Sequence, residues 1–379
     1  MNQYAREIRH ELHRFPEIGF ELPKTLALLR RELDAMGVEY TEKFGKSGIV
    51  ATINPEKSHY TIAIRADMDA LPITEATDVP FKSEHEGKMH ACGHDAHTAI
   101  ALATLRELNS IKEKISCRVK FIFQPAEEFA PSGAMLMAND GVMDDIDEIV
   151  ALHVDPDIDA GAVAFIPEYM NATSNGFLLD FYGKSAHVAF QQYGVDAIMM
   201  AMRAYMDIEF VIAKEISARE PIIFNVGAIH GGETNNVVCN HASMFCTLRT
   251  HNDDTAGYVV DKIKRIGEAV ASTAGGRFEY TQKKYYPTVY NNPEIEAKLR
   301  LAAKKVVGEK NIFEKKRGMG GEDFSYFSNI KPGCMFRLGI KNEALGMTHG
   351  LHTALFNIDE LGIDTGVEIF KTYVLDNMK

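Results

Sequence analysis

The chain has 379 residues, of which 46% are hydrophobic and 25% are charged, and its formal net charge is -12. This composition is typical of a globular protein with a sizeable buried core, and it excludes a disordered or collagen-like chain. At roughly 100–200 residues per domain, the length predicts two domains. The negative net charge disfavours nucleic acid and anionic membranes as partners. Because no apolar run is long enough to span a bilayer and the five cysteines are scattered, we expect a cytoplasmic protein without a disulfide framework.

The first part of the chain alternates helices and strands. Apolar residues at helical spacing predict helices over residues 2–14 and 24–36, and Asp95 is expected to cap a helix that extends to residue 108. Short runs rich in β-branched residues predict strands over residues 48–53, 60–64, 119–123 and 149–154. This alternation predicts an α/β domain with a mostly parallel sheet flanked by helices.

A different order of elements begins near residue 175. The predicted strands and helices follow the order βαββαβ of a ferredoxin-like unit, over residues 177–182, 194–214, 222–229, 242–250, 253–273 and 277–283. The chain then resumes a helix over 293–307 and a strand over 335–338. We therefore expect a discontinuous catalytic domain of residues 1–172 and 288–379, with an inserted domain of residues 173–287.

Side chains that can bind metal are concentrated just before the third predicted helix, in the segment His90-Ala91-Cys92-Gly93-His94. In an extended segment, residues i and i+2 point to the same side, so Cys92 and His94 can address one ion. The alternative is that His90, His94 and His97 lie on an ordinary helix surface. Gly93 favours the first reading, because it indicates that the helix starts later.

A pair of glutamates, Glu127 and Glu128, directly follows the predicted strand 119–123. Adjacent side chains in an extended segment point in different directions, so one carboxylate can bind a metal while its neighbour acts as a general base. A solvated turn is the alternative, and only the position after a strand argues for the site.

Four further candidates fall near the ends of predicted strands or near the C-terminus. They are Asp67, Asp69, His153 and His352. A histidine such as His153 is often only a hydrogen-bonded core residue, and the two aspartates could bind metal or orient a ligand histidine. The carboxyl edge of an open α/β sheet is the usual place for a site, which favours a shared role.

The spacing of residues in two other motifs does not assign them a function. The first, His10-Glu11-Leu12-His13, has its histidines too close together for the zinc-protease motif. The second is Glu322-Asp323-Phe324, which follows a glycine-rich turn. We expect it at a helix N-terminus, and spacing alone does not assign it to a site.

The motifs in chain order together carry a resemblance that no single one of them would. They are Leu12-His13-Arg14-Phe15-Pro16-Glu17, Arg65-Ala66-Asp67-Met68-Asp69-Ala70-Leu71-Pro72, Met89-His90-Ala91-Cys92-Gly93-His94-Asp95, Gln124-Pro125-Ala126-Glu127-Glu128, Leu152-His153-Val154, Glu322-Asp323-Phe324 and Leu351-His352. This set resembles the two-metal amidohydrolases of the aminoacylase and carboxypeptidase-like family. The similar branch includes hippurate hydrolase, indole-acetyl-amino-acid hydrolases and N-acetyldiaminopimelate deacetylase.

The resemblance implies a catalytic domain with an inserted lid and dimerisation domain, and it implies roles for particular residues. Five side chains match the ligands of two divalent ions, with the Cys92 thiolate as the bridge: Cys92, His94, Glu128, His153 and His352. Zinc or manganese is expected, and nickel and cobalt fit as well. Glu127 matches the catalytic base and His187 the lid histidine that stabilises the oxyanion. Asn236 and Arg249 match lid positions that bind the substrate carboxylate.

The resemblance further implies hydrolysis of the amide bond of N-acyl-L-amino acids, with hippurate-like or N-acetyl-amino-acid substrates, by a homodimer or tetramer joined through the lid. A dipeptidase or aminobenzoyl-glutamate-type hydrolase would use the same site. A cysteine hydrolase with Cys92 as nucleophile would use a different mechanism, and a binding protein on this fold would have no catalysis at all. The chain departs from the family pattern at Gln191, Ala197 and Cys239, where proline is usual, which leaves the substrate and the lid geometry open.

Overall fold

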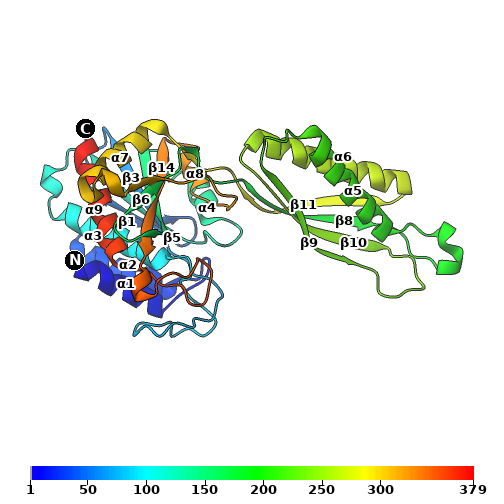
Figure 1. Ribbon diagram of the computed structural model, residues 1–379, viewed down its shortest axis with the longest axis horizontal. Helices are drawn as coiled ribbons and strands as arrows, with labels where there is room; N and C mark the ends of the chain where they lie inside the picture. The colour runs from blue at the N-terminus through cyan, green and yellow to red at the C-terminus, as the bar shows by residue number, and fades with distance from the viewer. Residues whose placement is uncertain (1) are drawn as a thin grey trace. The chain divides into compact units, whose positions relative to one another are not determined.

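The computed structural model describes residues 2–379, and the chain divides into two compact units (Figure 1). The first unit comprises the chain up to Met170, Val289–Lys316 and Asp323–Lys379. The second comprises Asn171–Thr288 and Arg317–Glu322, so a short later segment joins the inserted region. Within residues 2–379, no helix combines the length and the apolar character needed to cross a bilayer.

The first unit is built on an eight-stranded mixed sheet with the order β1-β2-β4-β3-β5-β14-β6-β13. Its central strands β4, β3, β5 and β14 run parallel. The pairs β1–β2, β2–β4 and β14–β6 are antiparallel, and the edge strand β13 pairs parallel with β6. The strands are β1 (Glu39–Phe44), β2 (Gly48–Ile53), β3 (Thr61–Asp67), β4 (Arg118–Gln124), β5 (Glu148–Asp159), β6 (Val163–Phe165), β13 (Ile312–Glu314) and β14 (Gly333–Lys341). A separate pair joins β7 (Glu168–Tyr169) to β12 (Tyr290–Asn291). The prediction of a mostly parallel α/β sheet is confirmed.

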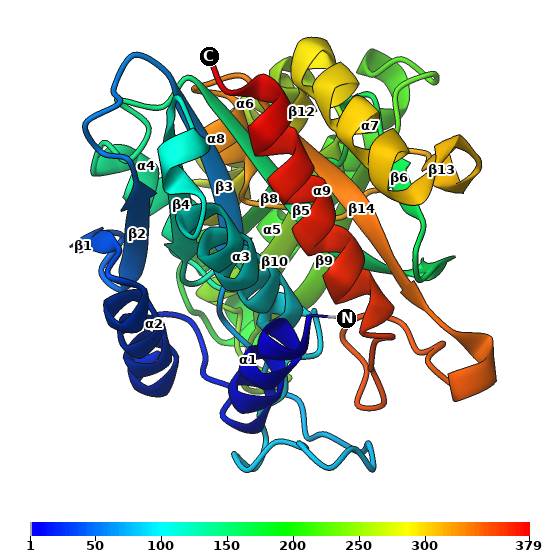
Figure 2. The ribbon, with the colours of Figure 1, turned by 90° about the vertical axis from the view of Figure 1, so that its left-hand side faces the viewer.

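Helices cover both faces of this sheet (Figure 2). One face packs against α1 (Gln3–Arg14), α2 (Pro23–Met36), α3 (His94–Asn109), α7 (Pro293–Val307) and α9 (Leu361–Asn377), and the other against α4 (Gly133–Asn139) and α8 (Ser325–Ser328). Successive strand residues point to opposite faces, so in β3 Ile62 and Ile64 belong to the first layer and Ala63 to the second. The central strands therefore read as continuous apolar runs, because both of their faces are buried.

The start of α3 differs from the prediction. The helix begins at His94, and its N-cap is Gly93, whose φ of 84° lies in the left-handed region. A Cβ atom there would lie 2.4 Å from Cγ2 of Val154, so glycine is required for space as well as conformation. Asp95 does not cap the helix. Its carboxylate accepts hydrogen bonds from His13 Nδ1 at 2.7 Å and Arg9 Nε at 3.1 Å, because a buried ion pair outcompetes a local cap.

The second unit has the predicted βαββαβ order, with the antiparallel sheet order β11-β8-β10-β9. Its elements are β8 (Ser174–Tyr182), α5 (Ala197–Glu215), β9 (Ile222–Gly231), β10 (His241–Thr250), α6 (Asp253–Ala274) and β11 (Arg277–Tyr286). The two helices begin at the side-chain caps Asp196 and Asn252, and they bury their apolar faces against one side of the sheet. Short 3-10 helices complete the chain: η1 (Lys112–Lys114), η2 (Val188–Tyr193), η3 (Glu309–Asn311) and η4 (Glu343–Leu345).

Candidate active site

The predicted metal ligands of the first unit meet at the carboxyl edge of its sheet. Strand β3 lies between β4 and β5, so the segments that follow these three strands are neighbours. Glu127 and Glu128 follow β4, and His153 lies in β5 past its pairing with β3. His352 comes from a distant loop, whose position is fixed by a hydrogen bond from the His352 N–H to the carbonyl of Ala91 at 2.8 Å.

Three overlapping groups that contain the predicted ligands have ligand atoms close enough together to hold a metal ion. Cys92 Sγ is 3.4 Å from His153 Nε2, and one ligand atom each from Cys92, His94 and His153 lie within 4.8 Å of one another. The same limit holds for the second and third groups, which are Cys92 with Glu128 and His352, and His94 with Glu127 and Glu128. The structure thus brings together all five predicted ligands and Glu127. Cys92, His94 and Glu128 each belong to two of these three groups, and the bridging role of the Cys92 thiolate stays a prediction.

Hydrogen bonds fix the tautomers of the two buried histidines in the first group. His94 Nδ1 lies 2.8 Å from the carbonyl oxygen of Asp69, and His153 Nδ1 lies 2.7 Å from that of Val154. A carbonyl only accepts, so each Nδ1 carries a hydrogen, and Nε2 has a lone pair when the ring is neutral. Burial opposes a charge on His94, but Asp67 and Cys92 raise its pKa well above its ordinary value. Nε2 of His94 is buried without a hydrogen-bond partner among residues 2–379. Burial also lowers the pKa of His153 well below its ordinary value, which favours the neutral form that binds metal.

The two aspartates that follow β3 hold the surrounding segments. Asp69 accepts hydrogen bonds from the N–H groups of Glu127 at 3.0 Å and Glu128 at 3.2 Å, which fixes the turn that presents both glutamates. Asp67 accepts from Arg65 Nη1 and from His97 Nδ1, both at 2.6 Å. The sequence left two roles open for these aspartates. Their contacts are those of residues that orient others.

A further buried network around Asp323 was not anticipated. Its carboxylate accepts hydrogen bonds from Arg65 Nη2 at 2.8 Å, Gln124 Nε2 at 2.8 and 2.9 Å, and Ser132 Oγ at 2.7 Å. It thereby joins β3, the end of β4 and the N-terminus of α4, and so braces the loop that carries Glu127. The sequence signal was the motif at Glu322-Asp323-Phe324, but motif spacing could not reveal its distant partners.

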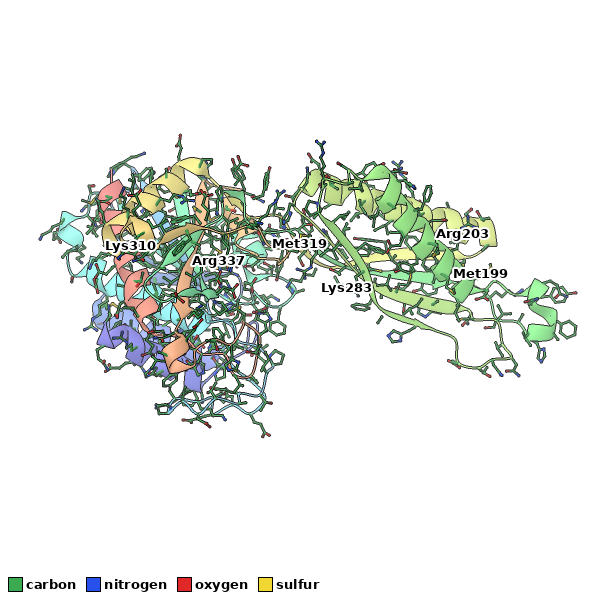
Figure 3. All side chains as sticks on the ribbon, in the orientation of Figure 1. Met199, Arg203, Lys283, Lys310, Met319 and Arg337 are labelled. Atoms are coloured by element: carbon green, nitrogen blue, oxygen red, sulfur yellow. The ribbon has the colours of Figure 1, made fainter. Side chains whose placement is uncertain are left out.

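The remaining predicted site residues lie in the second unit. His187 is exposed and precedes η2, where its Nδ1 accepts a hydrogen bond from the N–H of Ala189 at 3.1 Å. Its segment pairs with that of Asn236, whose carbonyl accepts from the N–H of Val188 at 3.0 Å. Arg249 on β10 donates from Nη1 to the carbonyl of Met319 at 2.8 Å, a residue labelled in Figure 3. Their catalytic and binding roles stay predictions.

Comparison with known proteins places this arrangement in a family. Residues 63–376 match the model of peptidase family M20/M25/M40. The chain belongs to this family. An N-acetyldiaminopimelate deacetylase of Geobacillus sp. is 33% identical over 97% of this chain and 96% of its own, and thermostable carboxypeptidase 1 of Saccharolobus solfataricus is 32% identical over 93% and 90%. The crystal structure of the Bacillus subtilis YxeP protein, described as a dinuclear metal-binding peptidase, superposes with a TM-score of 0.81 at 28% identity and covers 99% and 97% of the two chains.

The candidate site of this M20/M25/M40 hydrolase fits a divalent metal on its own chemistry. Thiolate, imidazole and carboxylate are the ligand types that zinc and similar ions prefer. Burial raises the pKa of the Cys92 thiol well above its ordinary value, and the neighbouring Glu128 adds to this effect. A divalent cation would reverse it, because a coordinating thiol is deprotonated. Burial and His352, whose Nε2 lies 3.1 Å from Glu128 Oε1, act in opposite directions on the pKa of Glu128, and the net effect lowers it.

Proposed function

We propose that this protein is a metal-dependent amidohydrolase that cleaves the amide bond of N-acyl-L-amino acids, with N-acetyl or hippurate-like substrates. The observation that carries the proposal is the convergence of the buried rings of His94 and His153, whose orientations are fixed by backbone carbonyls, around Cys92, with Glu127 and Glu128 beside them. The names of the relatives support amide hydrolysis, and the N-acetyldiaminopimelate deacetylase supports an acylated amino acid as substrate.

Two divalent ions would be held by the five converging side chains, which are Cys92, His94, Glu128, His153 and His352. Cys92 is the proposed bridge, as the resemblance to the two-metal amidohydrolases implies; like His94 and Glu128, it belongs to two of the three groups of ligand atoms. Zinc and manganese are the expected ions, and nickel and cobalt suit the same ligands. When bound, such ions lower the pKa of water and polarise the substrate carbonyl.

Glu127 is the proposed general base. It is 7% exposed, and its backbone N–H is anchored to Asp69, so its position is fixed before substrate arrives. The Glu127 carboxylate accepts a proton from the attacking water and then donates it to the nitrogen of the departing amine. One side chain thus serves as base and then as acid, which balances the proton over the reaction.

The second unit would supply contacts to the substrate. We propose that His187 donates a hydrogen bond to the oxyanion, and that Asn236 and Arg249 bind the free carboxylate of the amino acid. The exposure of His187 supports a role that needs an accessible ring. Arg249 uses Nη1 for the Met319 carbonyl, and its guanidinium has four other N–H groups with which to contact a carboxylate.

A homodimer joined through the second unit is the proposed assembly. The helix α5 exposes a row of large apolar side chains, namely Met199, Met202, Met206 and Phe210, and Met199 is labelled in Figure 3. Strand β9 is an edge strand of its sheet, with backbone groups available for pairing. Light scattering should give twice the chain mass, and a Met202→Glu, Met206→Glu double variant should give the monomer.

A dipeptidase or carboxypeptidase activity at the same site is the second candidate, favoured by the similarity to thermostable carboxypeptidase 1. A cysteine hydrolase fits less well, because burial raises the pKa of Cys92 and disfavours a thiolate nucleophile without a cation. A turnover screen of N-acetyl amino acids, hippurate-like amides and dipeptides over several metals tests these candidates. Faster cleavage of the N-acyl amino acids supports the proposal, and exclusive cleavage of dipeptides would replace it with the second candidate.

A further inference from the structure

The end of strand β5 lacks a strand partner on one side. The pairing of β5 with β3 ends at Ala151, opposite Arg65, so His153 and Val154 extend past it. There, the carbonyl of Val154 accepts from His153 Nδ1 at 2.7 Å, and its N–H donates to His97 Nε2 at 3.0 Å. Two imidazole rings therefore satisfy the backbone groups of Val154.

The hydrogen bonds of His97 leave it one protonation state. A backbone N–H only donates, so Nε2 of His97 carries a lone pair, and the hydrogen of the neutral ring is on Nδ1, where it is donated to Asp67 at 2.6 Å. His97 is 2% exposed, and burial lowers its pKa. Although burial opposes ionisation of Asp67, Arg65 at 2.6 Å holds the pKa of that carboxyl well below its ordinary value. The hydrogen bonds that link Arg65, Asp67, His97 and Val154 thus each have a defined donor and a defined acceptor.

We propose that His97 is a positioning residue that fixes the end of β5, so that Nε2 of His153 faces Cys92 Sγ in the ligand group. The proposal rests on the metal centre of the proposed function. If the N–H of Val154 were released, the carbonyl that fixes the tautomer of His153 would move with it. His97 is itself near His94 and Asp67, with ligand atoms within 4.8 Å, but both of its ring nitrogens are engaged, so it holds the site without binding the ion.

His90 provides a matched control in the same segment. It is 1% exposed, and neither of its ring nitrogens has a hydrogen-bond partner in the described part of the chain. His90→Phe therefore removes no hydrogen bond, whereas His97→Phe removes two from a ring of equal burial. The two variants make a similar change in side-chain shape, but only His97→Phe loses hydrogen bonds, namely those to Asp67 and to the Val154 N–H.

The experiment measures the metal content and the metal affinity of the full-length protein by competition with a chelator, with Zn²⁺ and Mn²⁺ as probes. His97→Phe should weaken the binding of one ion by about 10- to 100-fold, the range for removal of a partner of a metal ligand, and should leave the other ion bound. His90→Phe should bind both ions as the wild type does. Equal affinities in the two variants would overturn the proposal.

A second pair of variants covers the case in which His97→Phe does not fold. The amide of His97→Gln reaches the place of Nε2 and can accept from the Val154 N–H, whereas the shorter His97→Asn reaches only the place of Nδ1, beside Asp67. His97→Gln should retain tighter metal binding than His97→Asn, and the reverse order would contradict the proposal. A wild-type chain that binds no metal would reject the proposed function together with this inference, whereas a metal-binding wild type with insensitive His97 variants would reject this inference alone.

Discussion

Two buried clusters of charged and polar side chains in the first unit differ in how completely their polar atoms are hydrogen-bonded. At the amino end of β5, Glu148 accepts hydrogen bonds from Tyr60 at 2.6 Å, Tyr373 at 2.7 Å and Lys298 at 2.5 Å. At the carboxyl edge, Nε2 of His94 is buried without such a partner within the described chain, and Cys92 is a thiol whose pKa is raised by burial. In the Glu148 cluster the hydrogen bonds are made within the protein, whereas the carboxyl-edge cluster buries a ring nitrogen of His94 that has no hydrogen-bond partner among the described residues.

The difference shows which property identifies a site. Burial and charge are common to both clusters, and buried polar groups are normally hydrogen-bonded. Glu148 follows that rule, so its network stabilises the fold and has no need of a ligand. The carboxyl-edge cluster departs from it at Nε2 of His94, and a cation is the partner that would satisfy this nitrogen in a neutral ring. The comparison predicts that changes at one cluster affect chemistry and changes at the other affect stability.

The largest expected effect is on turnover at the carboxyl edge. Glu127→Gln keeps the shape of the side chain but cannot accept the proton, so kcat should fall by about 10²- to 10⁴-fold or more. Steady-state kinetics measures this loss, and elemental analysis should show wild-type metal content in the variant. Retained turnover in a metal-loaded variant would contradict the assignment of the base.

Metal should stabilise the protein through the same cluster. Ligand present at 100 times its dissociation constant stabilises a folded chain by about 2.7 kcal/mol, so Zn²⁺ or Mn²⁺ should raise the Tm of the metal-free protein. Cys92→Ala should abolish most of this increase, because it removes a proposed ligand that belongs to two of the three groups. An equal increase in Cys92→Ala would show that the added ions bind elsewhere.

Glu148 provides the opposite test. Glu148→Gln removes the charge that Lys298 and two tyrosines surround, and it should lower the free energy of unfolding by about 1–3 kcal/mol, as for a buried group left poorly paired. Urea unfolding of the metal-free protein measures the change, with the exposed Glu113→Gln as the control. Metal affinity and turnover should stay at wild-type values. A loss of either would contradict the claim that the Glu148 cluster affects only stability.

A separate buried pair, His13 and Asp95, should make the stability of the protein depend on pH. Burial opposes both charges, but Asp95 raises the pKa of His13 above its ordinary 6.5, and Arg9 and His13 lower that of Asp95 below its ordinary 3.8. The pair thus stabilises the fold most between these two pH values. The stability difference between wild type and His13→Gln should shrink as the pH rises through the folded pKa of His13, and again below the ordinary pKa of Asp95. A difference that is constant with pH would contradict a charged pair.

The sequence predicted much of this architecture because its signals are local. Strand and helix periodicities gave the α/β sheet and the βαββαβ unit, and the motifs that contain Cys92, Glu127 and His153 pointed to one edge of the sheet. The roles of Asp95 and Asp323 could not be predicted in this way, since Asp95 is paired with a residue 82 positions away and Asp323 with one 258 positions away. Short polar strands such as β1 also escaped prediction, because at an edge their side chains are mostly exposed.

The most direct test of the account is a metal titration of the metal-free, full-length protein, with bound ions per chain and hydrolysis of an N-acetyl amino acid followed in the same sample. The account predicts that two ions bind per chain and that hydrolysis appears with their occupancy. Hydrolysis that proceeds fully in the metal-free protein, or a chain that binds no divalent ion, would contradict it.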